Sequence, residues 1–153
     1  MNTRFDAIDR AIASTMMRWG QPALRYSLAI VFVWFGLLKP LGLSPAENLV
    51  RETVSWMPLF TPAVWVKIIG WWEVAIGLLF LWNYTTRIAI ALLAGQMIGT
   101  FLPLIVLPEV AFQSDGFPFA LTMEGQYIVK NLLIISAALV IGGRVRETAA
   151  SKP

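Results

Sequence analysis

The sequence predicts an all-α integral membrane protein, a four-helix bundle preceded by an N-terminal amphipathic interfacial helix. The first observation is composition: 58% of the 153 residues are hydrophobic and 14% are charged, against about 45–50% and 25% in soluble domains. The second is that the apolar residues form four separate segments, each about as long as the ~20 residues that a helix needs to cross a bilayer. The third is that the chain has no Cys and no His.

The four predicted spans cover approximately residues 22–41, 62–82, 87–107 and 125–141. Pro22 and Pro62 suit the first turn of a helix, where a missing N–H costs nothing. Pro103 lies inside the third span and should kink it. The spans therefore define one membrane domain over residues 21–142, followed by a tail at 143–153.

Two shorter helices are expected outside the spans. Residues 1–20 carry apolar side chains at helical spacing, which predicts an amphipathic helix on the cytoplasmic membrane surface. These apolar side chains are Phe5, Ile8, Ile12, Met16 and Trp19. The segment around 45–54, between the first two spans, also has the pattern of a short helix, with Leu49, Val50 and Val54 on one side.

The Lys and Arg residues beside the spans indicate the orientation. Those expected on the cytoplasmic side are Arg4, Arg10, Arg18, Arg25, Arg87, Arg144, Arg146 and Lys152. In the loops on the other side, the only Lys or Arg residue is Arg51. The positive-inside rule then places both termini in the cytoplasm, with the chain in a bacterial inner membrane. The net charge of +3 is accordingly expected to meet anionic lipid and not nucleic acid.

The missing residue types exclude several kinds of chemistry. Without Cys there is no disulfide, thiol redox centre or thiolate metal site, and without His there is no Ser-His pair. The acidic residues of the loops are dispersed, so we expect no metal site. The sequence assigns no catalytic residue, and any redox role must depend on a bound cofactor or a partner protein.

Ionisable residues inside the spans mark the candidate site, because each costs about 2.5–3.5 kcal/mol at mid-membrane. Glu73 lies about 11 residues inside the second span, roughly 16 Å deep, on the face that carries Gly70 and Gly77. Small residues mark close helix approaches. Glu73 therefore faces the bundle interior, and Lys130 is the expected ion-pair partner.

The other intramembrane polar residues are expected to gather from the midplane toward the outer side. The candidate ligand-binding or proton site comprises Lys39, Trp72, Glu73, Gln96, Tyr127, Lys130 and Asn131. Lys39 and Lys67 lie near enough to the interface to extend their ammonium groups to water. Gly95 and Gly99 form a G-x-x-x-G pair typical of helix packing. The sequence leaves open whether Glu73 and Lys130 form a structural pair or a functional site.

Three blocks resemble the DoxX-like superfamily of small four-helix membrane proteins, and its YkgB-like branch most closely. They are RYSLAIVFVWFGLLK (25–39), GWWEVAIGLL (70–79) and EGQYIVKNLL (124–133), and the resemblance extends over 25–142. It implies links to quinone-coupled sulfur oxidation, membrane oxidoreductase assemblies and oxidant stress. The superfamily's four-helix thiol–quinone reductases use a Cys-x-x-Cys that this chain lacks.

The expected function is that of a membrane subunit that binds a quinone or another small molecule in a redox or oxidant-stress process. If it belongs to an enzyme, that enzyme is a quinone-linked oxidoreductase. We expect no covalent cofactor, and contacts with lipid, with a redox partner protein or with further copies of the chain. The alternatives are a transport or permeation subunit for a small anion or acid, and a purely structural assembly subunit.

Overall fold

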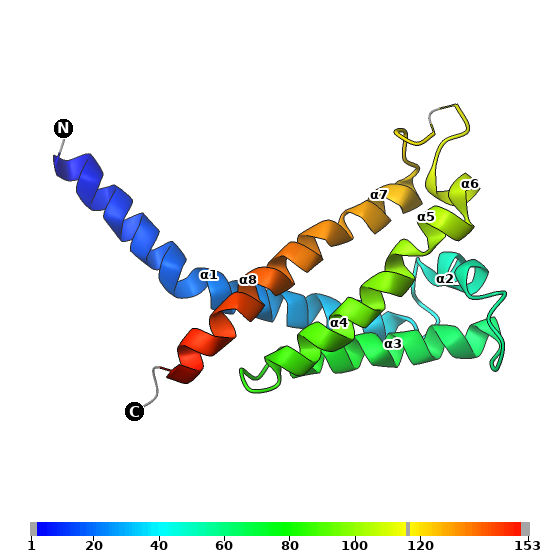
Figure 1. Ribbon diagram of the computed structural model, residues 1–153, viewed down its shortest axis with the longest axis horizontal. Coiled ribbons are helices and arrows are strands. Elements are labelled where there is room, and N and C mark those ends of the chain that lie inside the picture. The colour runs from blue at the N-terminus through cyan, green and yellow to red at the C-terminus, as the bar shows by residue number, and fades with distance from the viewer. Residues whose placement is uncertain (1–2, 116, 151–153) are drawn as a thin grey trace.

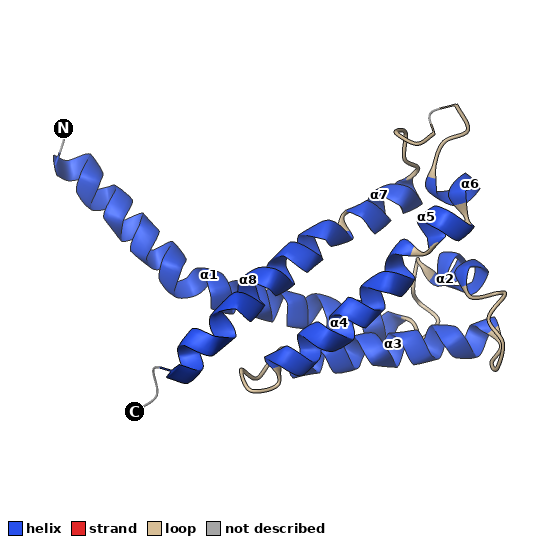
Figure 2. Ribbon diagram, viewed as in Figure 1, coloured by secondary structure: helices blue, strands red, loops and turns tan. Residues whose placement is uncertain are grey.

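The computed structural model describes the backbone of residues 3–115 and 117–150, and the side chains of 5–115 and 117–143. This part of the chain is helical and has no β-strand (Figure 2). Its helices are α1 (Thr3–Leu38), α2 (Glu47–Thr53), α3 (Pro62–Leu79), α4 (Thr86–Phe101), α5 (Pro103–Val106), α6 (Pro108–Ala111), α7 (Met123–Val129) and α8 (Asn131–Ala150). Four helical stretches are long and apolar enough to cross a membrane: Phe5–Leu38, Pro62–Leu79, Thr86–Val106 and Met123–Gly143. The predicted fold class is confirmed.

The four spanning stretches form one bundle in which α1 and α4 each pack against both α3 and α8. The beginning of α1, the end of α8 and the α3–α4 loop lie at one end, and α2, α5, α6 and the beginning of α7 lie at the other (Figure 1). We call these the terminal end and the loop end. The buried core includes Leu28, Phe32, Ile76, Phe80, Leu93 and Ile141. These positions fill the half of the bundle nearer the terminal end.

Glycines bring α1 and α3 into close contact. A Cβ added at Gly36 would lie 2.9 Å from the carbonyl oxygen of Gly70, and one at Gly77 would lie 2.8 Å from the carbonyl oxygen of Ala29. The expectation that Gly70 and Gly77 mark a close helix approach is therefore confirmed.

The predicted G-x-x-x-G pair has no comparable role within the described part of the chain. A Cβ added at Gly99 would meet no atom within 4 Å, and one at Gly95 would reach only the ring of Trp72, at 3.9 Å. Both glycines lie on an exposed part of α4, so they do not set the distance between helices of this bundle.

The third and fourth spans are both interrupted toward the loop end. The kink predicted at Pro103 is confirmed, because α4 ends at Phe101 and α5 begins at Pro103. A second interruption, at Lys130 between α7 and α8, was not predicted. There the side-chain amide of Asn131 donates to the carbonyl oxygens of Tyr127 and Ile128, at 2.9 and 3.1 Å. Buried carbonyl groups in a bilayer require such partners.

The N-terminal segment differs from the prediction. The sequence suggested that a separate interfacial helix ends near residue 20 and that Pro22 begins the first span, but both belong to the continuous helix α1, with Pro22 inside it. The first part of α1 projects from the bundle at an angle to the rest (Figure 1), and a proline within a helix bends it because it removes one backbone hydrogen bond. The apolar stripe of this segment is exposed.

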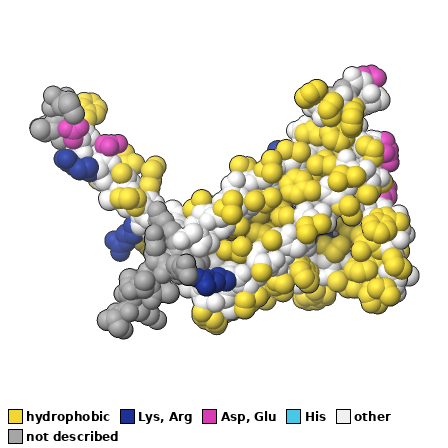
Figure 3. Space-filling model, in the orientation of Figure 1, with side chains coloured by type: hydrophobic (Ala, Val, Ile, Leu, Met, Phe, Trp, Pro, Cys, Tyr) yellow, Lys and Arg dark blue, Asp and Glu magenta, His cyan; other side chains and the backbone are white. Residues whose placement is uncertain are grey.

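The surface of the bundle is that of a membrane protein. On the face shown in Figure 3, hydrophobic side chains cover the region between the two ends, most of the visible Lys and Arg lie toward the terminal end, and acidic groups lie at the loop end. Acidic groups also lie on the projecting part of α1. The side chains of Arg4, Arg144 and Arg146, and all of Lys152, lie outside the described residues.

Candidate functional site

A buried ion pair between Lys39 and Glu73 lies at the centre of the site. The Lys39 Nζ is 2.5 Å from the Glu73 Oε2, and the two side chains are only 8% and 13% exposed. Lys39 directly follows the end of α1, while Glu73 lies in the middle of α3. The two residues meet because Gly36 and Gly70 let these helices approach closely.

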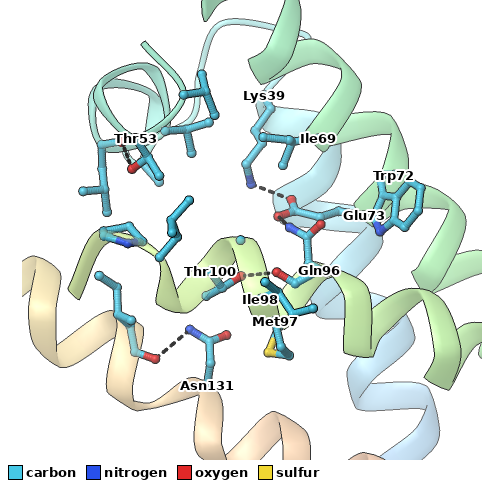
Figure 4. Close-up of a pocket in the computed structure, with 18 of the residues that line it drawn as sticks. Lys39, Thr53, Ile69, Trp72, Glu73, Gln96, Met97, Ile98, Thr100 and Asn131 are labelled. Carbon is cyan, nitrogen blue, oxygen red and sulfur yellow. Dashed lines mark hydrogen bonds and ion pairs between the residues drawn. The ribbon is translucent and has the colours of Figure 1, made fainter. Parts of the chain in front are cut away.

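Gln96 of α4 completes this cluster. Its side-chain amide donates to the second carboxylate oxygen of Glu73, Oε1, at 3.0 Å. Both oxygens of Glu73 therefore accept a hydrogen bond, one from each neighbouring helix (Figure 4). Thr100, one turn further along α4, donates its hydroxyl to the backbone carbonyl of Gln96 at 3.0 Å. We refer to Lys39, Glu73 and Gln96 as the polar cluster.

The expected pairing of Glu73 with Lys130 is wrong. Lys130 lies at the interruption between α7 and α8, where it is exposed and its Nζ lies 5.1 Å from the centre of the Tyr127 ring. The expectation that Lys39 extends toward water is also wrong, because its side chain is buried, whereas Lys67 is exposed. Position along a span does not tell which helices are neighbours.

A cavity of about 640 Å³ lies beside the polar cluster, in the half of the bundle nearer the loop end. The wall is formed by the end of α1, one side of α2, parts of α3 and α4, and the α7–α8 junction, and it is mainly aliphatic and aromatic. The charged, amide and hydroxyl side chains in the wall are Lys39, Thr53, Glu73, Gln96, Thr100, Tyr127 and Asn131. An apolar cavity with a few converging polar groups is the usual form of a small-molecule site.

The structure brings six of the seven predicted site residues to this cavity. Lys39, Glu73 and Gln96 form the polar cluster, and Trp72, Tyr127 and Asn131 also line the cavity, whereas Lys130 does not.

Trp72, Tyr127 and Asn131 line the cavity without belonging to the polar cluster. The indole N–H of Trp72 donates to the carbonyl of Leu92 at 3.3 Å, and the ring points away from the carboxylate of Glu73 (Figure 4). Asn131 uses its amide N–H groups on the backbone. Tyr127 is largely exposed at the edge of the cavity.

Sequence reasoning missed the part of the wall that α2 provides. Leu49, Val50, Thr53 and Val54 line the cavity, although the short helix itself was correctly expected and its apolar side was recognised. Trp65 and Ile69 were also missed. The available signal was their spacing, since Trp65, Ile69 and Glu73 follow one another at intervals of four residues and so share one face of α3.

The fold and the site together define a small multi-pass helical membrane protein with a buried ion pair beside an apolar cavity. The chain belongs to the DoxX family, whose family model matches residues 20–106, more than half of the sequence. This range includes Lys39, Glu73 and Gln96 and ends before Tyr127, Lys130 and Asn131. No curated protein and no solved structure matches the chain. The superfamily resemblance is thus confirmed, and the YkgB-like branch stays a prediction.

Proposed function

We propose that this protein is a quinone-binding membrane subunit that takes part in a redox process, with the polar cluster and its cavity as the binding site. The observation that carries the proposal is the ammonium group of Lys39. It is buried at the cavity, and the hydrogen bonds of the described residues give it one acceptor, Glu73 Oε2. An ammonium group has three N–H donors, so two are left for a ligand or water.

A quinone fits the chemistry of this cavity. Its carbonyl oxygens accept hydrogen bonds, and its ring and isoprenoid chain are apolar, which suits a wall built largely from aliphatic and aromatic side chains. The volume of about 640 Å³ lies within the range of roughly 300–1,000 Å³ usual for small-molecule sites. Lys39 would donate to a carbonyl oxygen, and Gln96 would donate with its second amide N–H.

Glu73 would handle protons in this proposal. Reduction of a quinone to a quinol consumes two electrons and two protons, and a carboxylate next to the ring can pass a proton to a reduced oxygen. The chain contains no Cys and no His, so we expect the electrons to come from a redox partner protein.

The experiment is a quantitative quinone analysis of purified protein. The protein is extracted from membranes in mild detergent, bound lipids are released with organic solvent, and ubiquinone and menaquinone are measured by mass spectrometry per mole of protein. We expect close to one quinone per chain in the unaltered protein. A protein that folds, as judged by circular dichroism and size-exclusion chromatography, and retains no quinone would refute the proposal.

Variants locate the site. In the double variant Lys39→Met/Glu73→Gln both charges are removed together, so no unpaired charge stays buried. A charge-assisted hydrogen bond contributes about 1.5–3 kcal/mol, so quinone retention should fall about tenfold or more. The matched control is Lys130→Met, which changes a lysine outside the cavity wall and should retain quinone. Equal retention in both variants would place the quinone elsewhere.

The two alternatives predict different results. Transport of a small anion is not favoured by the cavity, because Lys39 is neutralised by Glu73, and neither Lys67 nor Lys130 lines the wall. A purely structural subunit is consistent with the ion pair as a link between α1 and α3. It predicts that the double variant keeps the protein's cellular role as long as the bundle stays folded.

A further inference from the structure

We infer that the ligand of this cavity is a neutral, lipid-soluble molecule that enters sideways from the bilayer, while α2 separates the cavity from the water at the loop end. The inference rests on the proposed binding function and adds to it the charge class of the ligand and its route. Three independent features of the wall support it.

The first feature is the position of α2. The helix lies at the loop end (Figure 1) and contributes Leu49, Val50 and Thr53 to the cavity wall. Its other side carries Glu47, Asn48, Arg51 and Glu52, where Arg51 donates to Glu47 at 2.6 and 2.8 Å. Figure 4 shows Thr53 on the cavity side of this helix. A short helix with an apolar inner side and a charged outer side forms a cover between an apolar space and water.

The second feature is where the wall is exposed. Three lining residues of the spanning helices are largely exposed: Phe35 at 53%, Tyr127 at 62% and Ile98 at 75%. They lie on α1, on α7 and on α4. Exposed side chains within spanning helices face lipid. The sides of the cavity therefore border the hydrocarbon region, from which a lipid-soluble molecule can enter.

The third feature is charge. The cavity wall contains one cationic side chain, Lys39, and one acidic side chain, Glu73, and these two pair with each other. An anion would add an uncompensated charge to an apolar cavity, which is costly. A neutral head group that accepts hydrogen bonds from Lys39 and Gln96 adds none.

The absence of native cysteines allows a direct test by single-cysteine accessibility. The Thr100→Cys variant places a thiol in the cavity wall with little change in size. Two controls surround it: Asn48→Cys on the outer side of α2, and Leu133→Cys on an exposed, lipid-facing part of α8. Each variant, in lipid vesicles, is treated with the charged 2-sulfonatoethyl methanethiosulfonate or the uncharged benzyl methanethiosulfonate, and modification is followed by mass spectrometry.

The expected result is that the benzyl reagent modifies the Thr100→Cys variant and the sulfonate reagent does so at least about 100-fold more slowly than it modifies Asn48→Cys. The reason is that a sulfonate would have to leave water, at several kcal/mol. Comparable sulfonate rates for the two variants would show an aqueous opening and overturn the inference. Failure of both reagents at position 100, with normal benzyl modification of Leu133→Cys, would show a cavity closed to lipid and would also overturn it.

These outcomes are separable from the proposed function. Lipid access with no quinone retained would refute the quinone and leave the route standing. Quinone retention together with rapid sulfonate modification would leave the proposed function standing and refute the route.

Discussion

Glu73 is the residue on which the polar cluster depends. A carboxylate deep in a bundle needs partners for both oxygens, and it receives one from Lys39 and one from Gln96. Glu73 belongs to α3, Gln96 belongs to α4 and Lys39 directly follows α1, so the cluster links the end of α1 to α3 and α4. A residue with this arrangement affects both the stability of the bundle and the chemistry of the cavity, and the two effects must be separated by experiment.

A double-mutant cycle separates the charge pair from its surroundings. We expect Lys39→Met to destabilise the bundle by about 3–5 kcal/mol, because it leaves a buried charge without its partner. Adding Glu73→Gln should recover most of this loss, since a neutral amide can still accept from Gln96. Reversible unfolding in mixed micelles measures both. The single variant Glu73→Gln completes the cycle, and a loss in the double variant equal to the sum of the two single losses would contradict the coupling. Lys130→Met is the control and should change stability little.

At the scale of elements, the contact between α1 and α3 decides where the polar cluster forms. The backbone atoms of Gly36 and Gly70 lie where a side chain would otherwise separate the helices. The helices run in opposite directions, so Glu73 lies beside Gly36 and Lys39 lies beside Gly70: an added Cβ at Gly36 would be 3.0 Å from the Glu73 Cβ, and one at Gly70 would be 2.8 Å from the Lys39 Cβ. The same glycines that bring the helices together therefore bring the two charged residues within reach of each other.

Glycine substitutions test this role. A Cβ at Gly70 would lie 2.8 Å from the carbonyl oxygen of Gly36 and 2.8 Å from the Cβ of Lys39. We therefore expect Gly70→Ala to force the helices apart, to cost about 1–3 kcal/mol and to weaken ligand retention.

The matched control is Gly99→Ala, which would meet no atom within 4 Å and should be neutral or slightly stabilising, because alanine favours helix more than glycine does. Thermal unfolding in detergent compares the two variants. Equal melting temperatures would show that α1 and α3 can separate without loss.

At the scale of the whole molecule, the two ends of the bundle differ in charge. The start of α1, the end of α8 and the α3–α4 loop share one end (Figure 1). Arg87 begins the helix after that loop, while Glu109, Asp115 and Glu124 belong to the opposite end. The positive-inside rule predicts that the terminal end faces the cytoplasm.

Reporter fusions in a bacterial host test this orientation. Green fluorescent protein attached after Pro153 should fluoresce, because it folds in the cytoplasm, and alkaline phosphatase attached there should be inactive. Alkaline phosphatase inserted at Asp115, in the loop before α7, should be active. The reverse pattern would show that the loop end faces the cytoplasm and that the Lys and Arg bias does not set the topology.

Features that depend on local sequence pattern could be predicted from the sequence alone. The length of each apolar segment is matched to the thickness of a bilayer, so the four spans could be recognised, and Pro103 signalled an interruption by its chemistry. The interruption at Lys130 had no comparable signal, because neither Val129 nor Asn131 excludes a helix. The continuity of α1 through Pro22 was missed because a proline is equally compatible with a helix start and with a bend.

The sequence by itself determined that this is a four-span membrane protein of the DoxX family and that Glu73 faces other helices of the bundle. Only the tertiary structure decided that Glu73 pairs with Lys39, that Lys130 lies outside the cavity wall, and that α2 contributes to that wall. The physical reason is that hydrophobic pattern reports depth and the buried side of a single helix. Which residue pairs with Glu73 depends on which helices approach most closely. Here the glycines between α1 and α3 allow the closest approach, and Lys39 therefore pairs with Glu73.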